Sequence, residues 1–471
     1  MKHYTISLLL FLTTSFFAAS AQNHTRISGK IKNAPQNAMT LYHVDSFQEL
    51  VKYEVKPNAK GEYQVVLPLD QAYYIIHFVN KYFFVRPKDQ LIINFDYDTP
   101  ETSIRVQGTC AKENTFLLEY QQRFSVMNEL MPMTQLEVSD FCSHIDKIDT
   151  EKQAFYEKAR LTSSFSKEFE HYLSNAIILQ SAFRKMTYVD LYGFYREGKV
   201  LDLPEGYYKF IEALPKEDES LLHHPDYYYF LSGIVSLAVR ELGKFKDKNT
   251  PPSNYLQDTY KVVELLYRNQ QKEFMQANII KNALRSASWG IAEEMYQKHL
   301  KEQPNNPYNA GLSAIYEKAK QFATGQAAPD FVLEDAQGKR FSLKDFRGKL
   351  VYIDFWASWC GPCIKGFPYA KKLKEELKAL QLDAEVVFLY ISVDTYKENW
   401  LEAVDKYQME GIHLIDSEVA KIKDISTTLG KAYQLRGIPH YMLIDREGRF
   451  IEYKAPHPES VLPLIQQKIK E

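Results

Sequence analysis

Cysteine is scarce in this chain, with four residues in 471. Small domains stapled by disulfides need a far higher cysteine density, so a disulfide scaffold is excluded. A structural zinc site usually takes two close pairs of ligands, and the chain has a single close pair, Cys360 and Cys363. We therefore expect no metal site and no bound cofactor.

An excess of charge of either sign is also missing. The chain has 58 basic and 60 acidic residues, a net charge of -2, and no long block of one sign. Nucleic acid is therefore not an expected partner. The 33 Tyr and 28 Phe are spread through the chain, which favours packing over a base-stacking platform.

Long apolar runs are absent beyond the first residues. Lys2, the apolar stretch 6–17 and Ala19-Ser20-Ala21 have the order of a cleaved secretory signal, so residues 1–21 are predicted to be a signal peptide. The apolar stretch is shorter than the roughly 20 residues of a membrane anchor. Gln22, and not cysteine, follows the cleavage site, so neither a lipid anchor nor a stable membrane anchor is expected.

The length suits two to four domains of about 100–200 residues each. Residues 22–108 are predicted to form a β-rich, sandwich-like domain of antiparallel strands, because short runs rich in β-branched and aromatic residues alternate with turn formers. The expected strands cover 25–31, 39–44, 50–55, 62–67, 72–79, 82–85 and 91–97.

The pattern changes after Gly108. Residues 109–322 carry apolar residues at helical spacing, which predicts an α-helical middle region; within it, His223-His224 is expected to be a solvated loop pair and not a metal site. In residues 323–471 strand-like and helix-like segments alternate and end in a hairpin and a helix from about Pro458, which predicts an α/β domain. The fold class is therefore multidomain.

The most informative segment is Trp359-Cys360-Gly361-Pro362-Cys363, which lies between an apolar strand-like run, 350–355, and a helix-like stretch. A helix N-terminus favours a thiolate and lowers the pKa of a cysteine there. We therefore predict that Cys360 is the nucleophile and Cys363 the resolving thiol of a redox dithiol. A permanent structural disulfide is the alternative.

Two further positions are candidates. Asp354 lies within the apolar run before the dithiol, where burial would raise its pKa and let it take the proton of Cys363. A carboxylate on an edge strand, satisfied by hydrogen bonds, is the alternative. Ile438-Pro439 precedes another strand; a cis proline there would offer the Ile438 backbone to an incoming peptide, whereas spacing alone also allows a trans turn.

Together these motifs resemble the thioredoxin superfamily, and within it the exported TlpA-like and ResA-like thiol-disulfide oxidoreductases. The resemblance spans about 324–471. It rests on five features, which are Gly325-Gln326-Ala327-Ala328-Pro329-Asp330-Phe331, the Gly338 turn, Phe346-Arg347-Gly348-Lys349, Asp354-Phe355-Trp356-Ala357-Ser358-Trp359-Cys360-Gly361-Pro362-Cys363 and Gly437-Ile438-Pro439. It implies the thioredoxin fold, a reactive Cys360, a resolving Cys363, a buried proton-handling Asp354 and a cis Pro439. Trp359, Gly361, Pro362 and Ile438 would then contact substrate.

The resemblance has limits. Relatives that serve cytochrome c maturation commonly carry a glutamate three residues after the second cysteine, where this chain has Gly366, so that specialised role is not implied. Residues 24–108 also resemble the β-rich N-terminal domain often attached to such proteins in Bacteroidetes. Peroxiredoxins share the segment before the dithiol, but their peroxidatic cysteine follows a Pro and Thr that are not found here.

The resulting hypothesis is a periplasmic protein-disulfide reductase. Its expected partners are disulfide-containing protein substrates and a membrane thiol-electron carrier that restores the dithiol. Two alternatives remain: a disulfide oxidase or isomerase using the same dithiol, and a binding or scaffold protein whose N-terminal regions recruit partners. The remaining cysteines, Cys110 and Cys142, are expected to be buried thiols, with a disulfide between them as the alternative.

Overall fold

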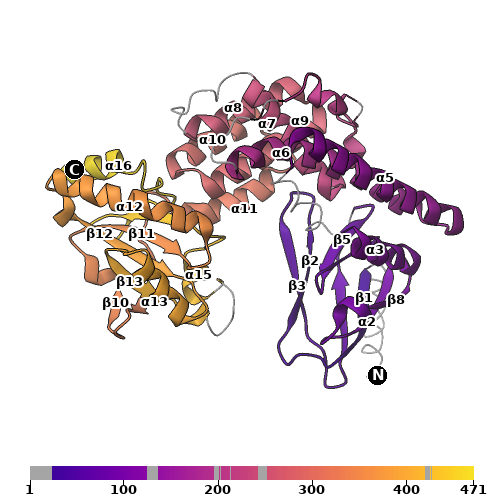
Figure 1. The fold of residues 1–471 in the computed structure, drawn as a ribbon, viewed down its shortest axis with the longest axis horizontal. Coiled ribbons are helices and arrows are strands. Elements are labelled where there is room, and N and C mark those ends of the chain that lie inside the picture. Colours follow the sequence, from indigo (N-terminus) through magenta and orange to yellow (C-terminus); the bar gives the residue numbers. More distant parts are fainter. Residues whose placement is uncertain are drawn as a thin grey trace, which may run out of the picture. The chain divides into compact units, whose positions relative to one another are not determined.

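A computed structural model describes residues 24–69, 71–124, 136–195, 201, 203–212, 214–241, 252–419, 425 and 427–471 (Figure 1). The predicted signal peptide and the start near Gln22 lie outside these residues. The described chain forms two compact units: one holds the residues before 251 together with Asp258–Met275, and the other holds 252–257 and Gln276–Glu471. A β-rich start, a helical middle and a C-terminal α/β domain confirm the multidomain fold class. The boundaries at 108 and 322 stay predictions.

Two four-stranded sheets build the N-terminal part of the first unit, in the orders β4-β1-β7-β8 and β3-β2-β5-β6. Their alternating inward residues form one core, with Ile27 and Leu91 from the first sheet and Leu41 and Ile76 from the second. The strands are β1 (Thr25–Lys32), β2 (Met39–Val44), β3 (Leu50–Val55), β4 (Glu62–Leu67), β5 (Tyr74–Phe78), β6 (Lys81–Val85), β7 (Gln90–Asp96) and β8 (Arg105–Gly108), with α2 (Pro100–Ser103) before β8.

The expectation of purely antiparallel strands is wrong at one place. Strands β1 and β7 pair in parallel, with Ile27 opposite Leu91. Strand β8, which the sequence did not predict, pairs with β7 and has one half-buried and three exposed residues. Strand direction across a long connection leaves no local pattern, and a short exposed edge strand shows no apolar alternation.

The free edge of β6 is covered by α3 (Ala111–Arg123). The Asn114 side chain accepts a hydrogen bond from Phe84 N and donates to Phe84 O, both at 2.8 Å. Two helical turns further along, the Gln121 amide makes the same two hydrogen bonds with the backbone of Tyr82, at 2.9 Å in each direction. Side-chain amides thus take the place of a neighbouring strand, which protects the edge from pairing with other chains.

Further helices follow in the middle region. They are α5 (Val138–Thr162), α6 (Lys167–Tyr195), η2 (Tyr207–Ile211), η3 (Glu219–His223), α7 (Pro225–Glu241), α8 (Pro252–Leu266), α9 (Asn269–Ser286), α10 (Trp289–Glu302) and α11 (Asn309–Lys320). No helix among the described residues is long and apolar enough to cross a membrane.

The prediction of a solvated His223-His224 pair is wrong for the second histidine. His224 is fully buried, stacks on Tyr172 and contacts the Tyr172 carbonyl through Nε2 at 3.0 Å. Its Nδ1 accepts a hydrogen bond from Asp226 N. Burial lowers the pKa of His224. It is a neutral, satisfied core residue, which a sequence pattern cannot distinguish from an exposed histidine.

The C-terminal part of the second unit is a seven-stranded mixed sheet in the order β10-β9-β13-β12-β11-β14-β15. Its strands are β9 (Val332–Glu334), β10 (Arg340–Ser342), β11 (Leu350–Trp356), β12 (Val386–Ser392), β13 (Ile412–Ile415), β14 (His440–Ile444) and β15 (Phe450–Glu452). Its helices are η4 (Leu343–Phe346), α12 (Gly361–Ala379), η5 (Asp383–Glu385), α13 (Lys397–Lys406), α15 (Thr428–Ala432) and α16 (Leu462–Lys470).

Strand β11 is an interior strand of this sheet, between β12 and β14, and all its residues are buried. It pairs in parallel with β12 and antiparallel with β14. Its even-numbered side chains, such as Tyr352 and Trp356, share a core with α12, α13 and α16, whereas Ile353 and Phe355 share the opposite core with α15 (Figure 1). The sheet is therefore covered by helices on both faces, as the sequence predicted.

Predicted bounds differ from the observed ones at the end of the chain. The last helix begins at Leu462 and not at about Pro458, because His457–Ser460 form a turn in which Ser460 N donates to His457 O. The short strands β9, β10 and β13 were not predicted. They have three or four residues each, too few for an apolar period to be recognised.

One prediction concerns β1. Tyr63 lies opposite Gly29, and its hydroxyl donates to Ile93 O at 2.8 Å; a Cβ on Gly29 would lie 1.9 Å from that oxygen. The Gly29→Ala variant should lose about 1–3 kcal/mol of local stability through overpacking. Hydrogen exchange of the full chain should therefore become faster in β1 and β7. The matched control is Gly290→Ala, where nothing lies within 4 Å; equal exchange in both variants would reject the prediction.

Candidate active site

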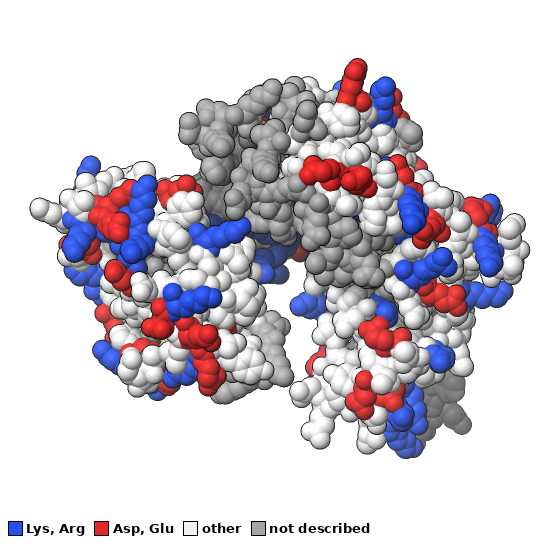
Figure 2. Space-filling view, viewed as in Figure 1, with Lys and Arg blue, Asp and Glu red and all other residues white. Residues whose placement is uncertain are grey.

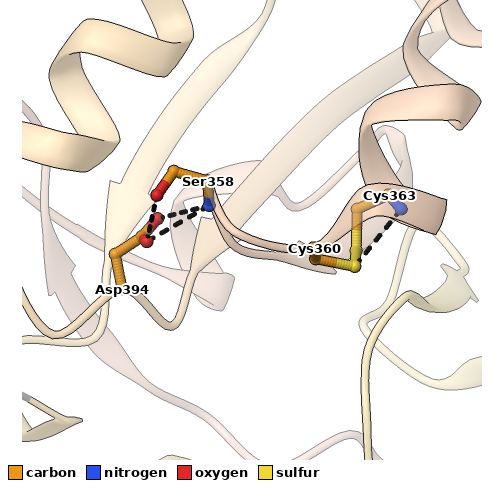
Figure 3. Close-up of a disulfide and its surroundings, with 4 residues drawn as sticks. All are labelled: Ser358, Cys360, Cys363 and Asp394. Atoms are coloured by element: carbon orange, nitrogen blue, oxygen red, sulfur yellow. Dashed lines mark hydrogen bonds between the residues drawn. A yellow bond between two sulfur atoms is a disulfide. The ribbon is translucent and has the colours of Figure 1, made fainter. Parts of the chain in front are cut away.

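The dithiol lies where β11 ends and α12 begins. Cys360 is the N-cap residue of α12, and its Sγ accepts a hydrogen bond from Cys363 N at 3.2 Å (Figure 3). A disulfide joins the two residues. Cys360 keeps 5% of its surface exposed and Cys363 none. An attacking sulfur atom can therefore approach Cys360 and not Cys363.

The residues around the disulfide are open to solvent on one side. Trp359 is 65% exposed, and Gly361 and Pro362 are exposed as well. A large exposed aromatic side chain beside a reactive group is unusual, since burial of such surface is strongly favoured. The three predicted contact residues are thus exposed beside the disulfide.

The loop before the dithiol is held by Asp394, a residue that the sequence did not point to. Its carboxyl group accepts the backbone N–H of Ser358, at 2.9 Å to Oδ2, and the Ser358 hydroxyl, at 2.7 Å to Oδ1 (Figure 3). The Ser392 hydroxyl donates to Oδ2 at 2.8 Å. Asp394 is almost fully buried at the end of β12. No local pattern in the sequence indicates this contact, because it joins two segments 36 residues apart.

Asp354 lies on the α12 face of β11 and is 3% exposed. The alternative of a satisfied carboxylate on an edge strand is wrong, because β11 lies between β12 and β14 and Asp354 Oδ1 has no hydrogen-bond partner among the described residues. Burial raises the pKa of Asp354 to about 8, and the positive charge of Lys374 opposes this. Such a group exchanges protons near neutral pH.

The structure brings Ile438 and Pro439 to the same end of the sheet as the dithiol. The Ile438–Pro439 peptide bond is cis, as the resemblance implied. His440, the next residue, is opposite Phe355 at the end of β11. Ile438 packs against the core cluster that includes Cys360 and Cys363. The predicted substrate edge and the predicted nucleophile are therefore neighbours.

The other two cysteines are free thiols. Cys110 is buried and donates to Asp89 Oδ2 at 2.6 Å. Burial and the neighbouring carboxylate raise the pKa of Cys110 beyond the range in which a thiolate forms. Cys142 is half-buried, and burial raises its pKa as well. The prediction of a buried thiol is confirmed for Cys110 and is wrong for Cys142, and the alternative of a disulfide between the two is wrong because both are free.

In the face of the molecule that Figure 2 shows, basic and acidic side chains intermingle on the C-terminal domain. Among the described residues, no three His, Cys, Asp or Glu side chains are placed to hold a metal ion. The dithiol and the buried carboxyl group stay the predicted reactive groups of the site.

Comparison with known proteins agrees with this geometry. The Redoxin family model matches residues 323–461. The thiol-disulfide oxidoreductase ResA of Bacillus cereus is 33% identical over 162 residues, which cover 33% of this chain and 83% of the relative. ResA of Bacillus subtilis is 29% identical over 140 residues, 30% of this chain and 72% of the relative.

Solved structures similar to this chain include other proteins named thiol-disulfide oxidoreductase. The thioredoxin domain of a thiol-disulfide oxidoreductase from Bacteroides vulgatus has a TM-score of 0.27 and 27% identity, covering 31% of this chain and 96% of its own. A thiol-disulfide oxidoreductase from Bacteroides fragilis has a TM-score of 0.27 and 24% identity, covering 30% and 99%.

The fold and site thus define a thiol-disulfide oxidoreductase of the thioredoxin superfamily. Within that class, the chain belongs to the TlpA/ResA-like family. The similarity covers the C-terminal domain; the described residues before 323 are outside the matched family model.

The buried carboxyl group predicts a pH-dependent stability. The ordinary pKa of an aspartate is near 3.8, and that of Asp354 is raised to about 8, so the folded state binds a proton that the unfolded state releases between these values. Asp354 therefore destabilises the fold progressively from about pH 4 to pH 8. The Asp354→Asn variant should be more stable than the natural chain by a few kcal/mol, roughly, above pH 8 and by little below pH 4.

Urea unfolding followed by tryptophan fluorescence measures this difference, because all four tryptophans lie in the second unit. A stability difference that does not change with pH would show that Asp354 is ionised in the folded protein.

The Asp394 contacts predict a second effect. In Asp394→Ala the Ser358 N–H and the Ser392 hydroxyl lose their common acceptor, so residues 357–360 should exchange amide hydrogens faster. Reduction of a model disulfide protein should slow by roughly tenfold, because the dithiol is no longer held in place. Asp394→Asn keeps one acceptor oxygen and should lose less. An unchanged rate of disulfide reduction in Asp394→Ala would show that the Asp394 hydrogen bonds do not affect the reaction of the dithiol.

Proposed function

We propose that this protein reduces protein disulfides outside the cytoplasm, with Cys360 as the attacking thiol and Cys363 as the resolving thiol. The observation that carries the proposal is the unequal burial of the two sulfurs at the N-terminus of α12. A thiolate at a helix N-terminus is stabilised by the unpaired N–H groups, and a nucleophile also needs access. Only Cys360 combines both.

In the proposed reaction the reduced enzyme starts as a Cys360 thiolate and a Cys363 thiol. The thiolate attacks one sulfur of the substrate disulfide, so that a Cys360–substrate bond forms, the substrate S–S bond breaks, and the other substrate sulfur leaves as a thiolate that takes a proton from solvent. The substrate is then held as a mixed disulfide.

The second step releases the substrate. Cys363 gives its proton to the Asp354 carboxylate and attacks Cys360 Sγ as a thiolate. The Cys360–Cys363 bond forms, the Cys360–substrate bond breaks, and the second substrate sulfur leaves as a thiolate that takes a proton from solvent. Two electrons pass from the dithiol to the substrate. A group with a pKa of about 8 is suited to this task, because it both accepts and returns a proton near neutral pH.

Substrate would bind beside the dithiol, on Trp359, Gly361, Pro362, Ile438 and Pro439. All five are exposed or partly exposed. The backbone at Ile438 would pair with an extended segment of the substrate, as a strand edge does in other peptide complexes.

The location and the direction of electron flow belong to the same proposal. The pattern of residues 1–21 supports export, and Gly361-Pro362 between the cysteines supports a reducing potential. A membrane thiol-electron carrier would restore the dithiol. Equilibration of the full chain with glutathione buffers tests the direction: a potential near the oxidising end of the superfamily would favour the oxidase or isomerase alternative.

The described residues before 323 are proposed to recruit substrates or partners. They lie outside the similarity to the family model, and they include two sheets and several helices of their own. If the full chain were a binding or scaffold protein alone, replacement of Cys360 would leave its cellular effect intact.

Replacement of each cysteine gives the direct test. The Cys363→Ser variant lacks the resolving thiol, so substrates should stay attached to Cys360 and be recovered as mixed disulfides, at least roughly tenfold more than from the natural chain. Non-reducing electrophoresis of the full chain isolated from cells, followed by mass spectrometry, measures this.

The matched control is Cys360→Ser, which should trap nothing, and neither variant should reduce a model disulfide protein. Equal trapping by both variants would contradict the assigned roles. Failure of Cys363→Ser to trap any protein would reject protein disulfides as the substrate.

A further inference from the structure

Helix α12 comes very close to strand β14 at Gly366. A Cβ at this position would lie 2.8 Å from Tyr441 Oη and 3.3 Å from His457 Nε2. Gly366 follows Cys363 by one helical turn, so it faces the same side of α12. The space that any side chain would need there is taken by a hydroxyl group and an imidazole nitrogen.

Tyr441 also lies beside the buried carboxyl group. It is opposite Asp354 in the pairing of β14 with β11, and side chains of such partners emerge about 4.5–5.5 Å apart on the same face. Tyr441 is 8% exposed. Neither Tyr441 Oη nor Asp354 Oδ1 has a hydrogen-bond partner among the described residues. Buried polar atoms are rarely left in this state, and here two of them start from adjacent positions.

The segment that carries His457 is fixed against the same two strands. Ala455 N donates to Tyr441 O at 3.0 Å, and the Tyr352 hydroxyl donates to Pro456 O at 2.7 Å. The ring of His457 packs edge to face on Tyr441, with 5.5 Å between the ring centres. Its position is therefore set by contacts with β11 and β14.

The hydrogen bond to His457 shows which ring nitrogen carries the proton. Glu459 N donates to His457 Nδ1 at 3.2 Å, so the neutral ring carries its hydrogen on Nε2. Burial lowers the pKa of His457, which keeps the ring neutral at neutral pH, against the opposing charge of Glu459. His457 Nε2–H is therefore a hydrogen-bond donor. It and Tyr441 Oη both lie beside the Cβ position of Gly366.

We propose that Tyr441 and His457 are positioning residues for Asp354. Because neither oxygen atom has a direct partner among the described residues, each contact runs through one water molecule: His457 Nε2–H donates toward the Tyr441 hydroxyl, and that hydroxyl donates toward the Asp354 carboxylate. This hydrogen-bond chain links the buried Asp354 carboxyl group, through the buried Tyr441 hydroxyl group, to the half-buried His457 imidazole. It stabilises the ionised carboxylate and so sets the pH at which Asp354 can accept the proton of Cys363. This role rests on the proposed function, in which Asp354 handles that proton.

Other groups act on the same carboxyl group and the same imidazole. The titratable groups that face Asp354 are Tyr352 on β11, Tyr390 on β12, Tyr441 on β14, and Cys363 and Lys374 on α12. Those that face His457 are Tyr369 on α12, Tyr441 on β14 and Glu459 in its own turn. Tyr390 is the matched control, because it is opposite Asp354 on the other side of β11.

The test is an infrared titration of the full chain. The carboxylic C=O stretch of Asp354, assigned by difference against Asp354→Asn, gives the midpoint at which the group ionises. Tyr441→Phe removes the donor to the carboxylate, so the midpoint should move up by about one pH unit. His457→Leu should move it in the same direction by less, and His457→Gln, which keeps an N–H donor, should restore it. Tyr390→Phe should leave it unchanged.

Gly366→Ala is the second variant, because its Cβ would displace the Tyr441 hydroxyl and the His457 ring. It should also move the ionisation midpoint of Asp354 up. It replaces Tyr441→Phe as the test if that variant does not fold. An unchanged midpoint in the folded variants, or an equal shift in Tyr390→Phe, overturns the proposal. The titration needs no activity. If the midpoints move as expected while the natural chain reduces no disulfide protein, the proposed function fails and the assignment of Tyr441 and His457 stands.

The pH dependence of disulfide reduction gives a second reading of the same variants. In Tyr441→Phe the rise in rate with pH should move to higher pH together with the infrared midpoint, with insulin as the disulfide protein. A rate profile that stays in place while the infrared midpoint moves would show that Asp354 does not handle the rate-limiting proton, and would overturn that part of the proposal.

Discussion

The site depends on the burial of strand β11. The strand pairs on both sides and is covered on both faces, so every residue from Leu350 to Trp356 is buried. Such a strand has one register and no freedom to slip, because a shift by one residue would exchange its two faces. The chain therefore leaves the sheet at a fixed point, and the cysteines follow there at the start of α12. The same strand places Asp354 on the α12 face and sets Tyr390 and Tyr441 on either side of it.

Much of this could be predicted from the sequence, because the strongest features are local. The apolar run, the paired cysteines and the following helix are contiguous, and the position of Cys360 as helix N-cap follows from their order. Strands β2, β3 and β4 have the predicted bounds, since each is a short apolar run between turn formers. Motifs in separate segments, such as Ile438-Pro439, could be placed only through the resemblance to a known family.

What could not be predicted depends on contacts between distant segments. Asp394 anchors the dithiol loop from the end of another strand, and its own neighbourhood in sequence gives no sign of that contact. The parallel pairing joins β1 to β7, two strands that are far apart in the sequence. His224 is an ordinary histidine in sequence and a fully buried one in the fold. Gly366 is informative only once Tyr441 and His457 are seen to fill the space beside it.

The burial that fixes the position of the site also lowers the stability of the fold. The Asp354 carboxyl group lies inside a sheet, and one of its oxygens has no hydrogen-bond partner in the part of the chain that the structure describes, so it destabilises the fold when it ionises. Function of this kind commonly requires a local departure from the most stable arrangement. In this chain the departure is confined to one polar position in a strand whose other residues are all apolar or aromatic.

The central claim is that the two thiols of the reduced protein are unequal. It is tested most directly by alkylation of the reduced full chain with iodoacetamide, with the modified cysteine identified by mass spectrometry at successive times. Cys360 should be modified first, at least roughly tenfold faster than Cys363, because access and the helix N-terminus both favour it. Equal rates, or faster modification of Cys363, would contradict the assignment of Cys360 as the attacking thiol.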